Sequence, residues 1–134
     1  MSTPYSGFGF DMGHLLANAD MANHQWKFVT TGSVAGEFKV GTGGSNPVPL
    51  GVLQNDPRQG EPGAIRVLGT TKVSASNAIG YGDFVTCGSH GLAIVQASAS
   101  ATAAGIALQA LSSGAGTIEI LLLPNALTSA DNTP

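Results

Sequence analysis

At 134 residues the chain has the size of one ordinary domain, long enough to bury a hydrophobic core without metals or disulfides. Only 10% of its residues are charged, against about 25% in an average soluble domain. A net charge of −3 with five scattered lysines and arginines argues against a nucleic-acid surface, which needs clustered cations. Small uncharged residues lose little hydration on contact, which favours burial against other subunits over a merely neutral surface.

The single cysteine cannot form an internal disulfide, and no cysteines or histidines have the spacing of a zinc site. We therefore expect no metal and no cofactor, and synthesis in a reducing cytoplasm. The N-terminus lacks the basic start and apolar segment of an export signal, and no run approaches the roughly 18 apolar residues of a membrane span. A soluble protein that does not contact membranes is expected.

Residues 1–24 are predicted to form an extended arm. Glycines and a proline are interleaved with Tyr5, Phe8 and Phe10, which gives apolar anchors without a sustained period. The segment HLLANADMANHQ offers at most a turn or two of helix. Because such anchors are more useful against a neighbour than in water, Tyr5, Phe8, Phe10 and the later Trp26 are the predicted contact residues. A disordered leader with incidental aromatics is the alternative.

Residues 25–123 are predicted to form an all-β domain of barrel or sandwich type. Short runs of β-branched and aromatic residues, from WKFVTTG to TIEILLL, are separated by glycine-rich turns. Residues 124–134 are predicted to be a polar C-terminal tail. The predicted core consists of Ile65, Val67, Ile79, Phe84, Val85, Ile106, Ile118 and Ile120.

The β domain contains an internal repeat. FVTTGS at 28–33 returns as FVTCGS at 84–89, GVLQ at 51–54 as GIALQ at 105–109, and GAIRVL at 63–68 as GTIEIL at 116–121. Three ordered matches at nearly one offset predict two similar β halves around a shared core. The last match makes Arg66 equivalent to Glu119, and alternation along the strands predicts that both are outward-facing charges that can pair.

The stretch FVTCGSHG brings Cys87 and His90 within four positions, as a nucleophile and its base would be. The first copy of the repeat has no such groups, which indicates a structural strand–turn–strand motif rather than an active site. Cys87 is then a small half-buried residue at a strand end, and Asp83 caps the preceding turn. Gly88 and Gly91 are expected to supply the positive φ angles of the turn.

An enzyme or small-ligand-binding barrel that uses Cys87, His90 and Asp83 is an alternative from another class. It requires a pocket that gathers these three side chains. The absence of a catalytic or cofactor site is the preferred interpretation.

Residues 50–123 resemble the capsid decoration (cement) proteins of tailed bacteriophages. The shared pattern is a Gly-Val-x-Gln strand, the strand IRVLGTTK, the step IGYGDFV and the closing hairpin GIALQA…GTIEILLL. The resemblance implies a non-catalytic β domain on the outer surface of the head. There it binds the major capsid protein and locks subunits together, often as a homotrimer and sometimes as a dimer. Such a protein is made in the host cytoplasm and resides in the virion. A tail or baseplate structural protein is a further alternative.

Overall fold

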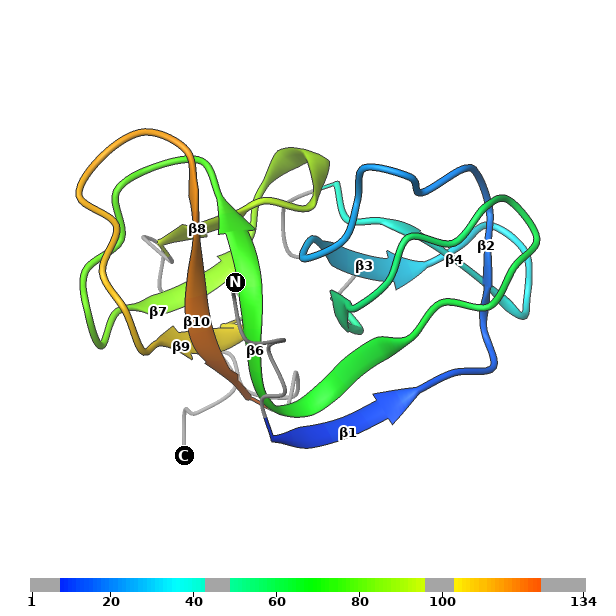
Figure 1. The fold of residues 1–134 in the computed structure, drawn as a ribbon, viewed down its shortest axis with the longest axis horizontal. Coiled ribbons are helices and arrows are strands. Elements are labelled where there is room, and N and C mark those ends of the chain that lie inside the picture. Colours follow the sequence, from blue (N-terminus) through cyan, green and yellow to red (C-terminus); the bar gives the residue numbers. More distant parts are fainter. Residues whose placement is uncertain (1–7, 43–48, 96–102, 124–134) are drawn as a thin grey trace, which may run out of the picture.

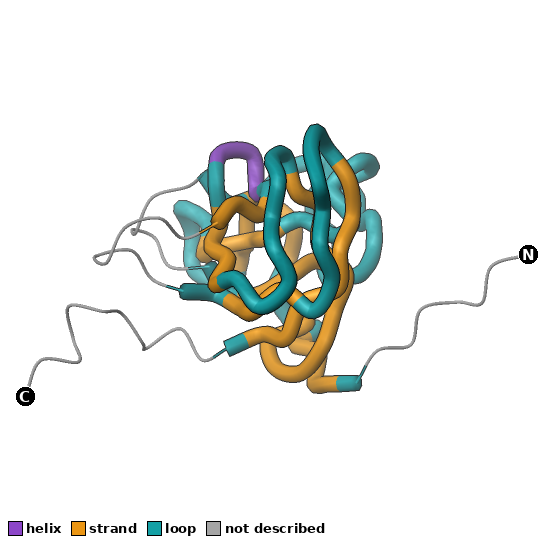
Figure 2. The backbone as a smooth tube through the Cα atoms, turned by 90° about the vertical axis from the view of Figure 1, so that its left-hand side faces the viewer, coloured by secondary structure: helices purple, strands orange, loops and turns teal. Residues whose placement is uncertain are grey.

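The computed structural model describes residues 8–42, 49–95 and 103–123, which form an all-β protein without an α-helix (Figure 1). The strands are β1 (Gly9–Met12), β2 (Leu16–Ala17), β3 (Phe28–Thr31), β4 (Glu37–Val40), β5 (Gly51–Leu53), β6 (Ile65–Ala75), β7 (Phe84–Cys87), β8 (Ala93–Val95), β9 (Gly105–Ala107) and β10 (Gly116–Leu122). One short 3-10 turn, η1 (Ser89–Gly91), is the purple turn in Figure 2.

Strand β6 runs through both halves of one ten-stranded sheet, and the halves lie side by side (Figure 1). The first half contains β4, β3, β5 and the start of β6, with β2 beside β4 and β1 beside β6. In the second half β8, β7, β9 and β10 form a closed five-stranded barrel with the end of β6. This end pairs with β10 along its length and meets β8 at Ala75. The predicted all-β barrel is confirmed.

The two halves have the same strand register. β3 pairs with β5 and β4 as β7 pairs with β9 and β8. The backbone amide of Leu53 donates to the carbonyl of Lys27 at 3.0 Å, and that of Ala107 donates to Asp83 at 2.9 Å. The predicted pair of similar halves is therefore confirmed. Equivalent register pairs are Phe28–Val52 with Phe84–Ile106, Val29–Gly51 with Val85–Gly105, and Val29–Val40 with Val85–Val95.

The third sequence match is displaced by two residues in the structure. Val52 is the register partner of Arg66, whereas its equivalent Ile106 is the partner of Leu121. Arg66 therefore corresponds to Leu121, and the predicted equivalence of Arg66 with Glu119 is wrong. The sequence match was misleading because a shift of two residues along a strand keeps every side chain on the same face.

The described part of the N-terminal arm lies along the first half. β2 pairs in parallel with β4, and in the second half the end of β6 pairs in parallel with β8. β1 pairs antiparallel with the start of β6, and in the second half the end of β6 pairs antiparallel with β10. The segment HLLANADMANHQ, for which at most a turn or two of helix was predicted, contains no helix, and Leu16–Ala17 is a strand. Ala17 and Met21 are buried and pack in the core of the first half. Tyr5 and the tail at 124–134 lie outside the described residues.

Each half has its own core cluster, and most of the predicted core residues lie in one of them. Val67 is half-buried against the first cluster. The prediction for Phe84 is wrong, because its side chain is 53% exposed, and Ile106 is only half-buried. Phe84 and Val85 are neighbours on one strand, so their side chains face opposite sides and only Val85 can point inward. The predicted residues that are buried are Ile65, Ile79, Val85, Ile118 and Ile120.

β6 bends at Gly69, where the strand leaves the first half and enters the barrel (Figure 1). Gly69 has a φ of +106°, in the region that favours glycine. A Cβ at this position would also overlap the backbone of Phe8 and Gly9. Glycine is thus required both for the bend and for the close approach of β1.

We expect Gly69→Ala to destabilise the protein more than Gly82→Ala. Gly82 has a similar φ of +86° but open space around it, so alanine there adds only backbone strain, about 1–2 kcal/mol. At Gly69 the same strain is joined by the overlap with β1. Urea denaturation of both variants measures the difference, and amides of β1 should exchange faster in Gly69→Ala. Equal losses of stability would contradict the proposed crowding.

Candidate interaction surface

Large apolar side chains are exposed where β1 lies against β6. Phe8 is 80% exposed and Phe10 is 68% exposed. Phe10 is the register partner of Leu68, which is 46% exposed. We call Phe8, Phe10 and Leu68 the β1 patch. Phe8 and Phe10 were predicted contact residues, whereas Leu68 was missed because a strand residue between a half-buried valine and a glycine gives no signal of its own.

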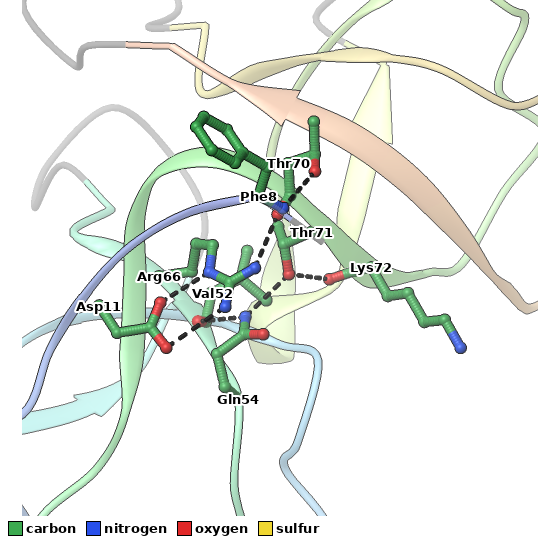
Figure 3. A network of polar contacts seen from close by, with 8 residues as sticks. All are labelled: Phe8, Asp11, Val52, Gln54, Arg66, Thr70, Thr71 and Lys72. Carbon is green, nitrogen blue, oxygen red and sulfur yellow. Dashed lines mark hydrogen bonds and ion pairs between the residues drawn. The ribbon is translucent and has the colours of Figure 1, made fainter. Parts of the chain in front are cut away.

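Arg66 of β6 binds Asp11 of β1 through two hydrogen bonds (Figure 3). Its Nε donates to Asp11 Oδ1 at 2.6 Å and its Nη2 to Asp11 Oδ2 at 3.3 Å. Its Nη1 donates to the carbonyl of Thr70 at 3.0 Å, across the bend. The Arg66 side chain is only 12% exposed, so this two-point contact is partly shielded from solvent. The strand that carries the β1 patch is thus joined to β6 by side-chain as well as backbone contacts.

Arg66 and Glu119, which were predicted to be able to pair, have different neighbours in the structure. Arg66 forms its ion pair with Asp11 of the N-terminal segment. Glu119 is instead the register partner of Lys72 on β6. Sequence reasoning could not find the first pair, because Asp11 and Arg66 are 55 positions apart.

A partly buried polar bridge joins β5 to β6 in the same region (Figure 3). Gln54 Nε2 donates to Thr71 Oγ1 at 2.8 Å and to the carbonyl of Val52 at 3.0 Å. Thr71 is completely buried, and its hydroxyl donates to the carbonyl of Lys72 at 2.9 Å. Because a buried polar group without a partner is costly, these bonds fix β5 against β6.

Trp26 lies at the junction of the halves and is half-buried. Its φ is +72°, and Gly82 holds the equivalent position in the second half with a φ of +86°. Both amides donate 2.8 Å hydrogen bonds, to Leu53 and Ala107 respectively. A bulky residue in this conformation is strained, so its side chain must contribute something that glycine cannot. Lys72 Nζ lies 5.9 Å from the indole centroid. A contact with another protein through Trp26 stays a prediction.

The side chains of the enzymatic alternative have separate structural roles. Cys87 is buried in the barrel core, more deeply than predicted, and its Sγ donates to the carbonyl of Gly88 at 3.2 Å. His90 is exposed in η1. Asp83 accepts a 2.8 Å hydrogen bond from the amide of Gly80, as expected of a turn cap.

The prediction for the φ angles of this turn is half right. Gly91 has a positive φ of +73°, but that of Gly88 is −93°. The second positive φ belongs to His90, at +60°. A sequence can show that a turn needs residues with positive φ, but not which of the adjacent residues adopt that conformation.

His24 lies in the turn before β3, where Lys27 Nζ is 3.2 Å from its Nδ1. Burial, and then the charge of Lys27, lower the pKa of His24 below its usual 6.5, while Asp20 and Asp56 oppose the shift. The neutral imidazole can accept a hydrogen bond from the Lys27 ammonium.

In the described ranges, no cluster of three or more His, Cys, Asp or Glu side chains is arranged to hold a metal ion. The described residues also form no helix with the length and apolar character needed to cross a membrane.

Comparison with known proteins identifies the class. The sequence model of the phage cement protein family matches residues 18–122, and the chain therefore belongs to this family. It is a structural protein of the phage head. Among solved structures it is similar to the head fiber gp8.5 N base of bacteriophage phi29, with a TM-score of 0.64 and 18% sequence identity over 88% of this chain and 97% of that one. No curated protein matches significantly.

We expect Cys87→Ser to leave incorporation into phage particles unchanged. A hydroxyl in the apolar barrel core should lower the free energy of unfolding by about 1–3 kcal/mol. Thermal unfolding and the protein content of purified particles measure the two effects. Loss of function in a normally folded variant would revive the enzymatic alternative.

The lowered pKa of His24 predicts that stability falls with acidification. Because the folded state favours neutral His24, the unfolded state takes up the proton more readily. The stabilisation is complete above pH 6.5 and is lost as the pH falls through the folded pKa. Denaturation between pH 8 and about 5 should show this fall, and His24→Gln should reduce it. If the stability of His24→Gln had the same pH dependence as that of the wild type, the assignment of the fall to His24 would be refuted.

Proposed function

We propose that this protein is a cement protein that binds the outer surface of the phage head and stabilises contacts between major capsid protein subunits. The observation that carries the proposal is the exposed β1 patch, on a strand that Arg66 joins to β6, in a chain with few charges. The fold shared with a head fiber base supports an outer position on the head.

The physical properties of the patch suit a contact with a protein shell. Burial of a phenylalanine contributes about 1.5–3 kcal/mol. Since β1 is already ordered on β6, little conformational entropy is lost when Phe8 and Phe10 are covered. Tyr5 and Trp26 are proposed to add to the same contact.

We further propose a homo-oligomer, with a trimer favoured and a dimer as the alternative. A single patch binds weakly, but linked copies on a symmetric site gain avidity by orders of magnitude without new contacts. The proposed partners include neither nucleic acid nor membrane, and no catalytic step or cofactor is involved. Synthesis in the host cytoplasm precedes incorporation into the virion.

The test is binding of Phe8→Ser/Phe10→Ser protein to purified heads that lack the cement protein. We expect at least a tenfold loss of affinity, from about 1.4 kcal/mol or more of lost apolar contact. Tyr81→Ser is the matched control, because Tyr81 is an exposed aromatic in a turn of the second half. Point variants are preferable to deletion of residues 1–20, which would remove buried Ala17.

Unchanged head binding by the double variant would reject the β1 patch as the contact. Cryo-electron microscopy of virions gives an independent test of location. Density for the protein in stacked rings on the tail tube would overturn the head assignment in favour of a tail component.

A further inference from the structure

β1 is attached to the rest of the protein by a short stretch of backbone pairing. Among the described strands it pairs with β6 alone, at four register positions, with a register shift between Phe10 and Asp11. The exposed side chains of Phe8 and Phe10 bury little apolar area against the domain. Because a short strand with few buried contacts can open at a low free energy, backbone pairing alone is a weak attachment for the β1 patch.

The second half holds the equivalent pair of residues without an ion pair. Arg66 corresponds to Leu121, whose register partner is Thr70, so Thr70 occupies the position that Asp11 has in the first half. These two uncharged residues lie within seven consecutive register positions that join β6 to β10. The ion pair between Arg66 and Asp11 is therefore found in the half where the pairing is shorter, and there a side-chain contact adds most to the attachment.

Arg66 is bonded near both ends of β1. Its two hydrogen bonds to Asp11 hold the part of the strand that follows the register shift. Its third hydrogen bond goes to the carbonyl of Thr70. Thr70 holds the start of the strand, because its amide donates to the carbonyl of Phe8 at 2.7 Å and its hydroxyl accepts from the amide of Phe8 at 3.1 Å (Figure 3).

The stem of Arg66 also lies against the backbone of β1. A Cβ at Gly9 would overlap the carbonyl of Leu68 and would lie 2.9 Å from Cδ of Arg66. With only 12% of its side chain exposed, Arg66 offers little surface to another protein. Any effect of Arg66 on binding is therefore exerted through β1.

We propose that Arg66 is a positioning residue that sets the affinity for the phage head by keeping β1 docked on β6. This role rests on the proposed function of the β1 patch in head binding. When a partner recognises only the docked strand, the apparent affinity is the intrinsic affinity multiplied by the docked fraction. Loss of the ion pair that lowers the docked fraction to about a tenth lowers the head affinity about tenfold.

The first experiment is hydrogen exchange of the isolated full-length protein with Asp11→Ala as the variant. We expect the amides of β1 to exchange about tenfold faster or more, while exchange in β7 and β9 of the barrel stays unchanged. A variant that merely destabilised the whole protein would speed exchange in the barrel as well. Arg66→Lys keeps the charge but not the two-point contact, so its β1 amides should exchange at an intermediate rate.

The second experiment is binding of the same variants to purified heads that lack the cement protein. Asp11→Ala should bind about tenfold more weakly than the wild type, and Arg66→Lys should lie between them. Glu119→Ala is the matched control, because it removes a carboxylate that faces Lys72 on β6 but lies on β10. Its head binding and its β1 exchange should equal those of the wild type.

Unchanged exchange of β1 in Asp11→Ala would overturn the docking role of Arg66. Faster exchange of β1 with wild-type head binding, while Phe8→Ser/Phe10→Ser loses binding, would overturn the positioning role and leave the proposed function intact. If Phe8→Ser/Phe10→Ser bound heads normally, the proposed function and the role of Arg66 in head binding would both fail. Weaker head binding by Glu119→Ala would show that a general loss of negative charge explains the effect.

Discussion

The structure depends on one strand that belongs to both halves of a single sheet. β6 can complete the first half and close the barrel of the second only because it turns between them at Gly69, where φ is +106° and no Cβ fits. Arg66 spans this turn by binding Asp11 on β1 and the carbonyl of Thr70. The bend, the placement of β1 and the exposure of the β1 patch are therefore consequences of one local constraint.

The two halves share a backbone plan but have diverged in their surfaces. Strand registers and turn hydrogen bonds coincide, while the equivalent positions Trp26 and Gly82 carry the largest and the smallest side chains. Phe28 and Phe84 are chemically identical, yet one is buried at the junction and the other faces solvent. The repeat therefore conserves the backbone plan while the burial of an equivalent side chain depends on what packs against it.

Membership of the phage cement protein family agrees with a surface whose burial requires little loss of hydration free energy. With only 10% charged residues, few ions lose their hydration when the surface is covered. The β1 patch gives the molecule an exposed apolar surface, which is proposed for contact with the capsid.

The sequence by itself determined the all-β class, the repeat and the exposure of Phe8 and Phe10, because strand alternation, glycine turns and ordered matches are local signals. It could not determine that Arg66 binds Asp11, that Arg66 corresponds to Leu121, or that Phe84 faces outward. Those facts depend on which strands become neighbours and in which register, and a shift of two residues preserves the alternating pattern on which a sequence prediction relies. Only the tertiary structure decided that one of two identical phenylalanines is covered, because burial is set by the half that packs against it.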